Sequence, residues 1–339
     1  MSAWDLVQQY SQTALSQLPA PAQQLVQNPI AQKAAGALIG LGLLRTINNS
    51  LTQWTLNNWT SAEPWSNSRE LVLLTGGCSG IGKQVMQDLS GKGVRVVILD
   101  IAEPNFKLPA NVAFYRADIT KSANIAEVAK LIRADHGEPT VLINNAGVGN
   151  DGTILEETEA KIRQSFEVNT ISHFLMVREF LPAMVRANHG HVITVASMAS
   201  FVALAEMADY CCTKVSALAF HETLRQELNH YYKAPRVRTS IVHPYWVRTP
   251  MIKVLTDWEK EFGQPIMTVD KVANAIVKQV LSQNSGQVLV PGHLAIARIV
   301  RALPTWLQEH VRSKESAKFK YMREQQERAE RAERDLQKA

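Results

Sequence analysis

The chain has 339 residues, of which 46% are hydrophobic and 20% are charged, so it can bury a large core and is neither disordered nor fibrous. Its net charge of +5 is spread along the chain instead of forming a Lys/Arg block, which argues against a nucleic-acid-binding protein. Its three cysteines, Cys78, Cys211 and Cys212, give no disulfide framework and favour a reducing compartment.

Residues 1–68 are predicted to be a polar start followed by an apolar arm. Residues 34–44 read AAGALIGLGLL between Lys33 and Arg45. This run is shorter than the about 20 residues that a membrane-spanning helix needs. Tryptophans, which favour the membrane interface, follow it at Trp54, Trp59 and Trp65. Two interpretations stay open: a membrane anchor over residues 30–60 that is interfacial or re-entrant, and a helix buried against the main domain.

A nucleotide-binding unit is predicted from residue 69 onward. The apolar run 71–74 is typical of a parallel strand buried on both faces, and it leads into TGGCSGIG at 75–82 and then a helix. Glycines let the backbone approach a pyrophosphate at the start of that helix. A second apolar run ends at Asp100, where a carboxylate can accept hydrogen bonds from the ribose of an adenosine. Together these features predict a dinucleotide site.

The same alternation continues to residue 292. Further strands are predicted at 112–115, 141–143, 191–195, 237–242 and 288–290. Helices are predicted between them at 123–134, 162–185, 208–232 and 269–281. This order predicts an α/β fold, a doubly wound parallel sheet of the Rossmann type. Five residues follow strand ends and are expected at one ligand-binding edge: Asp100, Asp118, Asn145, Ser197 and Pro244.

Three segments complete the predicted architecture. Residues 245–267 are too long for an ordinary connection and predict a lid or substrate loop. Residues 293–312 contain an amphipathic helix, broken near Pro304, that either touches lipid or caps the substrate pocket. Residues 313–339 carry mixed charge with few apolar positions, so we predict a solvated, frayed helix.

Tyr210 and Lys214 are four residues apart in a helical run, so they project from the same face. An ammonium beside a phenol favours phenolate and lowers the pKa of the tyrosine, which suits it for proton transfer near neutral pH. The pair is weak by itself, because Tyr and Lys occur four apart by chance in many helices.

Several motifs together resemble the short-chain dehydrogenase/reductase family over residues 69–292. They are TGGCSGIG at 75–82, NNAG at 144–147, Asn169, Ser197 and YCCTK at 210–214. The apolar arm and the tail resemble the membrane-associated retinol and hydroxysteroid dehydrogenases of this family. The resemblance implies an oxidoreductase that interconverts a lipophilic alcohol (retinoid, steroid or long-chain alcohol) and its carbonyl. It also implies a homodimer on the endoplasmic reticulum or a lipid droplet, and the cysteine usage favours a catalytic domain that faces the cytosol.

The resemblance implies roles for individual residues. Tyr210 would be the general acid/base, with Lys214 lowering its pKa and binding the nicotinamide ribose. Ser197 would hydrogen-bond the substrate oxygen, and Asn169 would hold a water in the proton relay. The other residues would contact the cofactor. They are Gly76, Ser79, Gly80, Ile81 and Gly82 at the pyrophosphate, Asp118 at the adenine, Val247 and Thr249 at the nicotinamide carboxamide, and Asn145 beside the cofactor.

Two features of this sequence bear on specificity. Tyr245 follows Pro244 where the family usually has glycine, so a bulky side chain is expected to reshape the pocket. Asp100 would repel a 2′-phosphate, and residues 77–79 contain no Lys or Arg, so we expect NAD in preference to NADP. Two other functions stay open: a soluble NADP-linked reductase of a small carbonyl in secondary metabolism, and a catalytically silent scaffold at a lipid surface. No metal site is predicted, because His189 and His191 lack a carboxylate or Cys partner at ligand spacing.

Overall fold

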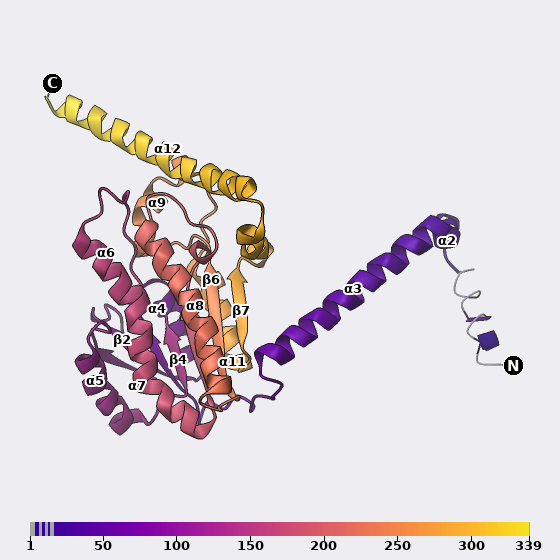
Figure 1. The fold of residues 1–339 in the computed structure, drawn as a ribbon, viewed down its shortest axis with the longest axis horizontal. Helices are drawn as coiled ribbons and strands as arrows, with labels where there is room; N and C mark the ends of the chain where they lie inside the picture. The colour runs from indigo at the N-terminus through magenta and orange to yellow at the C-terminus, as the bar shows by residue number, and fades with distance from the viewer. Residues whose placement is uncertain (1–3, 7–8, 11–12, 14–16, 339) are drawn as a thin grey trace. The chain divides into compact units, whose positions relative to one another are not determined.

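The computed structural model describes residues 4–6, 9–10, 13 and 17–338, and it divides the chain into two compact units, 1–55 and 56–339 (Figure 1). The helices α2 (Ala20–Gln27) and α3 (Pro29–Leu56) belong to the N-terminal part. Helix α3 runs through Lys33 and Arg45, so it is longer than the apolar run in the sequence. By length and composition it can cross a membrane, and none of its residues is buried.

A seven-stranded sheet forms the centre of the second unit, and all its neighbouring strands are parallel. The strands are β1 (Leu71–Thr75), β2 (Arg95–Asp100), β3 (Val112–Arg116), β4 (Val141–Asn144), β5 (Gly190–Val195), β6 (Val237–Pro244) and β7 (Gly286–Val290). Their order is β3-β2-β1-β4-β5-β6-β7, which confirms the doubly wound fold. The strand order reverses between β1 and β4, and ligands bind at such a point beyond the carboxyl ends of the strands.

Helices cover both faces of the sheet (Figure 1). On one face lie α4 (Gly80–Gly91) and α11 (Val269–Ser282). On the other lie α5 (Ser122–His136), α7 (Ser172–Ala187) and α8 (Ala208–His230). The helix predicted over 162–185 is interrupted: α6 (Glu159–Phe166) passes through a π turn, η1 (Glu167–Ile171), into α7.

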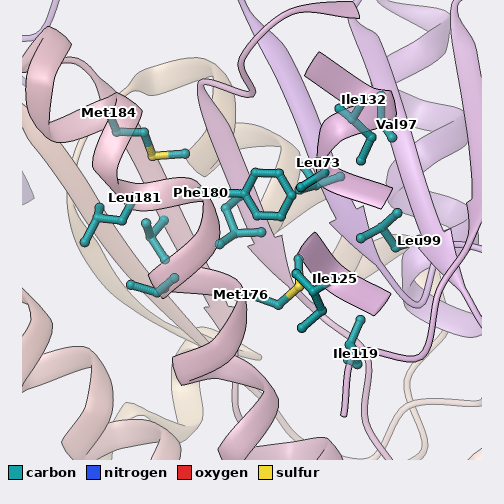
Figure 2. Close-up of a cluster of buried hydrophobic side chains, with 14 of the residues drawn as sticks. Leu73, Val97, Leu99, Ile119, Ile125, Ile132, Met176, Phe180, Leu181 and Met184 are labelled. Carbon is teal, nitrogen blue, oxygen red and sulfur yellow. The ribbon is translucent and has the colours of Figure 1, made fainter. Parts of the chain in front are cut away.

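The apolar runs form strands because their side chains are buried against helices on both sides. Figure 2 shows Met176 and Phe180 of α7 with Ile125 of α5 against Leu73 and Leu99 of the sheet. Burying each such side chain stabilises the fold by about 1.5–3 kcal/mol. The sheet is therefore a rigid platform for the residues at its carboxyl edge.

Short helices follow β6, and the tail is more ordered than the sequence predicts. The connection contains η3 (Pro250–Ile252), α9 (Lys253–Asp257) and α10 (Glu259–Phe262). After β7 come a 3₁₀ helix, η4 (Gly292–Ala302), and the long helix α12 (Thr305–Lys338), so the predicted break near Pro304 is confirmed. The prediction of a solvated helix from residue 313 is wrong in its first part, because Phe319 and Met322 of α12 are buried. The Phe319 ring packs 5.5 Å from Trp246 and 5.3 Å from Phe262 between centroids.

The boundary between the units falls earlier than the predicted one at residues 68 and 69. Arg238, buried at the second position of β6, explains this difference. Its guanidinium donates to the carbonyl oxygens of Asn57 and Thr60, each at 2.7 Å. A buried guanidinium needs such partners, so residues 57–60 are fixed at the amino end of the sheet.

Candidate active site

The glycine-rich turn between β1 and α4 brings backbone close to backbone. Gly76 has a φ of +69°, a conformation that favours glycine. A Cβ on Gly82 would lie 2.0 Å from the carbonyl oxygen of Gly76 and 2.6 Å from Nδ2 of Asn145. Gly82 therefore lets α4 start directly against the turn. The residues of the turn that line the adjacent cavity are Gly76, Ser79, Gly80 and Ile81, whereas Gly82 lies behind them.

Two carboxylates, one at the end of β2 and one just after β3, line the same cavity. Asp100 accepts hydrogen bonds from the N–H of Cys78 at 2.9 Å and of Ala102 at 3.1 Å, which hold the glycine turn against the end of β2. Asp118 accepts from the N–H and the hydroxyl of Thr120 at 2.9 and 2.6 Å. Burial, together with the charge of Asp100, raises the pKa of Cys78 to about 12, so this thiol stays protonated.

Two asparagines fix the chain at the switch point between β1 and β4. Asn145 donates from Nδ2 to the carbonyl oxygens of Thr75 and Gly76 at 2.9 and 3.1 Å. Asn169, buried in the π turn, accepts from the N–H of Val148 and donates to its carbonyl oxygen, both at 2.8 Å. Its Nδ2 also donates to the Thr213 hydroxyl at 3.2 Å, so both amide hydrogens are used. Asn169 lies outside the residues that line the cavity, and its side chain positions Val148, which does line it.

Ser197, Tyr210 and Lys214 meet at this cavity. Lys214 is only 4% exposed, its Nζ donates to the carbonyl oxygen of Val195 at 3.2 Å, and it lies 5.4 Å from the centroid of the Tyr210 ring. Ser197, two residues after β5, hydrogen-bonds Tyr210 and accepts from the N–H of Ala199 at 3.1 Å. The end of β5 thus brings Ser197 to the Tyr210–Lys214 pair in the first turns of α8.

Burial governs the proton affinity of these groups. It raises the pKa of Tyr210 to about 12, against the opposite effect of the hydrogen bond with Ser197. Burial lowers the pKa of Lys214 to about 8, so Lys214 is still protonated in most molecules at pH 7. The net pKa of Tyr210 is therefore raised and not lowered as expected, because the loss of solvent around the phenol dominates.

The cavity at the carboxyl edge of the sheet measures about 1260 Å³. This exceeds the about 300–1,000 Å³ of ordinary small-molecule pockets, and it leaves room for a dinucleotide and a large substrate together. Asn145, Val247 and Thr249 line it, as does Tyr245, whose hydroxyl donates to Oε1 of Gln264 at 2.7 Å. The expectation that Tyr245 shapes the pocket is confirmed to the extent that its side chain forms part of the wall.

The sequence did not show how much the end of the chain contributes to this cavity. Several residues of η4 and α12 line it, among them Leu294, Ala297, Val300, Leu307, Glu315 and Phe319. Residues 293–312 therefore cap the pocket, one of the two possibilities left open. The sequence signal for this contact was the pair Phe319 and Met322, two large apolar residues three apart in a charged run.

Sequence patterns also did not indicate that His243 contacts the site. Its Nδ1 hydrogen-bonds the carbonyl oxygen of Ser197 at 3.0 Å.

A doubly wound parallel sheet with a Ser–Tyr–Lys group beside a glycine turn defines a Rossmann-type oxidoreductase. Comparison with known proteins makes this specific. The sequence profile described as short chain dehydrogenase matches residues 70–260, and the chain belongs to this family. It is an alcohol or carbonyl oxidoreductase.

Named relatives agree with this membership. The chain is 39% identical over 207 residues to Dehydrogenase RED2 of Cochliobolus heterostrophus, covering 60% of this chain and 78% of that protein. It is 30% identical over 259 residues to human estradiol 17-beta-dehydrogenase 11, covering 74% and 84%. The crystal structure of 3-ketoacyl-(acyl-carrier-protein) reductase from Brucella melitensis complexed with NADH superposes with a TM-score of 0.60. That match is 21% identical and covers 67% of this chain and 98% of the other, so it supports the fold.

Proposed function

We propose that the protein interconverts a lipophilic alcohol and its carbonyl with NAD(H), and that Tyr210 is the general acid/base. One observation carries this proposal: Ser197, Tyr210 and Lys214 line the same large cavity as the glycine turn. A substrate oxygen beside Tyr210 would thus share an enclosed space with a cofactor on the turn. A catalytically silent scaffold would have no need for this arrangement.

The residues present fit a dinucleotide. Gly76 and Gly80 present backbone without side chains at the start of α4, where N–H groups favour a pyrophosphate. The Asp100 carboxylate in the cavity wall favours NAD over NADP, because it would repel a 2′-phosphate. Bound NAD supplies the hydride acceptor, and NADH the hydride donor.

The protein residues handle the proton. In the reducing direction, the neutral phenol of Tyr210 donates its proton to the substrate oxygen, while the Ser197 hydroxyl stabilises the negative charge that develops there. The ammonium of Lys214 then stabilises the phenolate, 5.4 Å from the centre of its ring. In the oxidising direction the phenolate accepts the proton. Asn169 positions the backbone at Val148, and we propose that it also holds a water in the proton relay.

The surroundings indicate a lipophilic substrate and a membrane location. Leu255, Val300, Leu307 and Phe319 give the cavity apolar walls. Helix α3 has 28 residues and is about 42 Å long. Consecutive apolar residues between Leu38 and Leu44 are exposed on all its sides, which is typical of a membrane-embedded helix. We therefore propose that residues 30–60 attach the protein to a membrane or lipid-droplet surface, with the catalytic unit facing the cytosol.

A homodimer is the proposed assembly. Ile171 of η1 and Phe174 of α7 are exposed apolar residues on the helix that follows Asn169. A second copy packed on this face would bury both side chains. Sedimentation of the full chain and of a Phe174→Asp variant in detergent measures the mass of the assembly. The wild type should sediment as a dimer and the variant as a monomer, and equal masses would contradict the proposed dimer.

Replacement of Tyr210 by Phe tests the mechanism. The variant keeps the ring, so we expect NADH binding to change by less than about threefold while alcohol oxidation falls by at least about a hundredfold. Tyr231→Phe is the matched control, because Tyr231 is 80% exposed at the end of α8 and should leave both values unchanged. Oxidation by the Tyr210 variant at the wild-type rate would refute the assignment. Titration of NAD and NADP with a panel of retinoid, steroid and fatty alcohols identifies the cofactor and the substrate class.

Alkaline carbonate extraction tests the membrane assignment. The full chain should stay in the membrane pellet, because α3 is embedded in lipid. A chain that starts at residue 56 should be released. Equal retention of the two would show that α3 is not the anchor.

A further inference from the structure

The 3₁₀ helix η4 at the cavity mouth presents three different rows of side chains, because residues three apart lie above one another in such a helix. The inner row lines the cavity and consists of Leu294, Ala297 and Val300. The outer row contains Ile296, 67% exposed, and Ile299, 50% exposed. The third row contains Arg298 and Arg301. The helix thus caps the pocket with one side and presents apolar and basic groups with the others.

Trp306 is a further exposed apolar residue, in the first turn of α12 just beyond the break at Pro304. It is 72% exposed and is not among the residues that line the cavity. Ile296 and Ile299, by contrast, are exposed and line the cavity as well, so they stand at its opening. An exposed apolar group of this kind marks a contact with a partner or with lipid. We call Ile296, Ile299 and Trp306, with Arg298 and Arg301, the docking face.

The charge of the docking face favours an anionic partner. Arg298 donates to the carbonyl oxygen of Gln287 at 2.8 Å, and Arg301 donates to that of Phe201 at 3.2 Å. Within the described part of the chain, neither guanidinium has an ion pair with a carboxylate, and η4 contains no acidic residue. Two positive charges in the same short segment as exposed isoleucine and tryptophan favour binding to an anionic membrane surface.

The edge strand β7 runs from the point where the chain enters the catalytic unit to the start of η4, which carries most of the docking face. At the start of β7, the N–H of Ser285 donates to Oδ1 of Asn57 at 2.8 Å. At its other end, η4 begins at Gly292, just after Val290. A strand of five residues spans roughly 17 Å. A flat lipid surface along this edge of the sheet would therefore meet both the entering chain and the docking face.

We propose that the docking face binds an anionic lipid surface, so that the cavity opens onto lipid and the substrate enters without crossing water. The nature of the substrate rests on the proposed function, whereas lipid contact at this face does not. The inference therefore adds a second membrane contact to the one made by α3. It also sets the orientation of the catalytic unit, with the β7 edge toward the lipid.

Fluorescence quenching tests the lipid contact. The full chain and a Trp306→Phe variant are placed in vesicles of phosphatidylcholine and phosphatidylserine, with and without bromine on the acyl chains. Brominated lipid should quench the wild type more than the variant, because only the wild type has an indole at position 306. The excess should shrink in vesicles without phosphatidylserine. Equal quenching of both proteins would place Trp306 in water and overturn the proposal.

Enzyme kinetics test substrate entry. Trp306→Ser should raise KM for a long-chain alcohol carried in vesicles by about tenfold, and leave kcat/KM for a short, water-soluble alcohol within about twofold. Tyr231→Ser, which removes an exposed ring elsewhere, should change neither. Equal losses on both substrates would refute entry from lipid. If no alcohol is oxidised at all, the proposed function fails, while the quenching result still decides the docking. Conversion of a dimer to a monomer by Trp306→Ser, without excess quenching, would show that a second copy covers this face and would overturn the proposal.

Discussion

Gly82→Ala is predicted to displace the glycine turn of the nucleotide site, although Gly82 does not itself line the cavity. The added Cβ would lie 2.0 Å from the carbonyl oxygen of Gly76 and 2.6 Å from Nδ2 of Asn145, both far below an ordinary contact. Neither neighbour can rotate away, because one is backbone and the other donates to Thr75 and Gly76. The start of α4 must therefore move by about 1 Å, and overpacking of this kind costs about 1–3 kcal/mol.

Alanine also has a compensating effect, since it is better than glycine inside a helix by about 1 kcal/mol. Because the clash is with fixed atoms, we take the upper end of the overpacking cost, about 3 kcal/mol, and expect a net loss of about 2 kcal/mol in the free energy of unfolding. NADH binding should weaken by at least about tenfold, because the turn that faces the cofactor is displaced.

Chemical denaturation and fluorescence titration with NADH measure the two effects. Gly91→Ala is the matched control in the same helix, where an added Cβ meets nothing within 4 Å. It should leave NADH binding unchanged and leave stability equal or slightly higher. If Gly82→Ala binds NADH as tightly as the wild type, the close packing of α4 on the turn does not shape the nucleotide site, and the reasoning fails.

Three further predictions follow from burial in the catalytic unit. Phe319→Ala should lower the free energy of unfolding by about 3 kcal/mol, while Tyr321→Ala, exposed on the same helix, should cost less than about 0.5 kcal/mol by chemical denaturation. Carbonyl reduction should fall as pH rises through about 8, where Lys214 loses its proton, and this inflection should be absent from the pH–rate profile of Lys214→Arg. His173 and His191 are buried, and burial lowers their pKa values to about 3. The unfolded chain therefore takes up two protons that the folded chain does not, and the free energy of unfolding should fall as pH drops below about 6.5. In acid denaturation the slope should approach about 2.7 kcal/mol per pH unit.

The fold and the nucleotide site could be predicted from the sequence because their signals are local. Continuous apolar runs report strands buried on both faces, and each run is followed within a few residues by the polar group that it positions. The glycines between residues 76 and 82 are required by the turn itself. Once the strands were known to be parallel, Asp100, Asn145 and Ser197 were expected at one edge, and the structure places them there.

What surrounds the site could not be read from local pattern. The pKa of Tyr210 depends on how completely other segments exclude water from the phenol, and the spacing to Lys214 contains no information about that exclusion. The buried position of Phe319 depends on Trp246 and Phe262, which lie more than fifty residues earlier in the chain. Likewise, Arg238 fixes residues 57–60 through contacts that span most of the chain.

The sequence by itself determined the doubly wound sheet and the glycine turn, because periodicity and strand ends are properties of short segments. The Ser–Tyr–Lys group was implied by the resemblance of several motifs to a known family. The tertiary structure alone decided how deeply the Tyr210 phenol is buried, that α12 lines the cavity, and that Ile296 and Ile299 of η4 stay exposed at its mouth. These properties arise from contacts between distant segments, which are set by the packing of the whole catalytic unit.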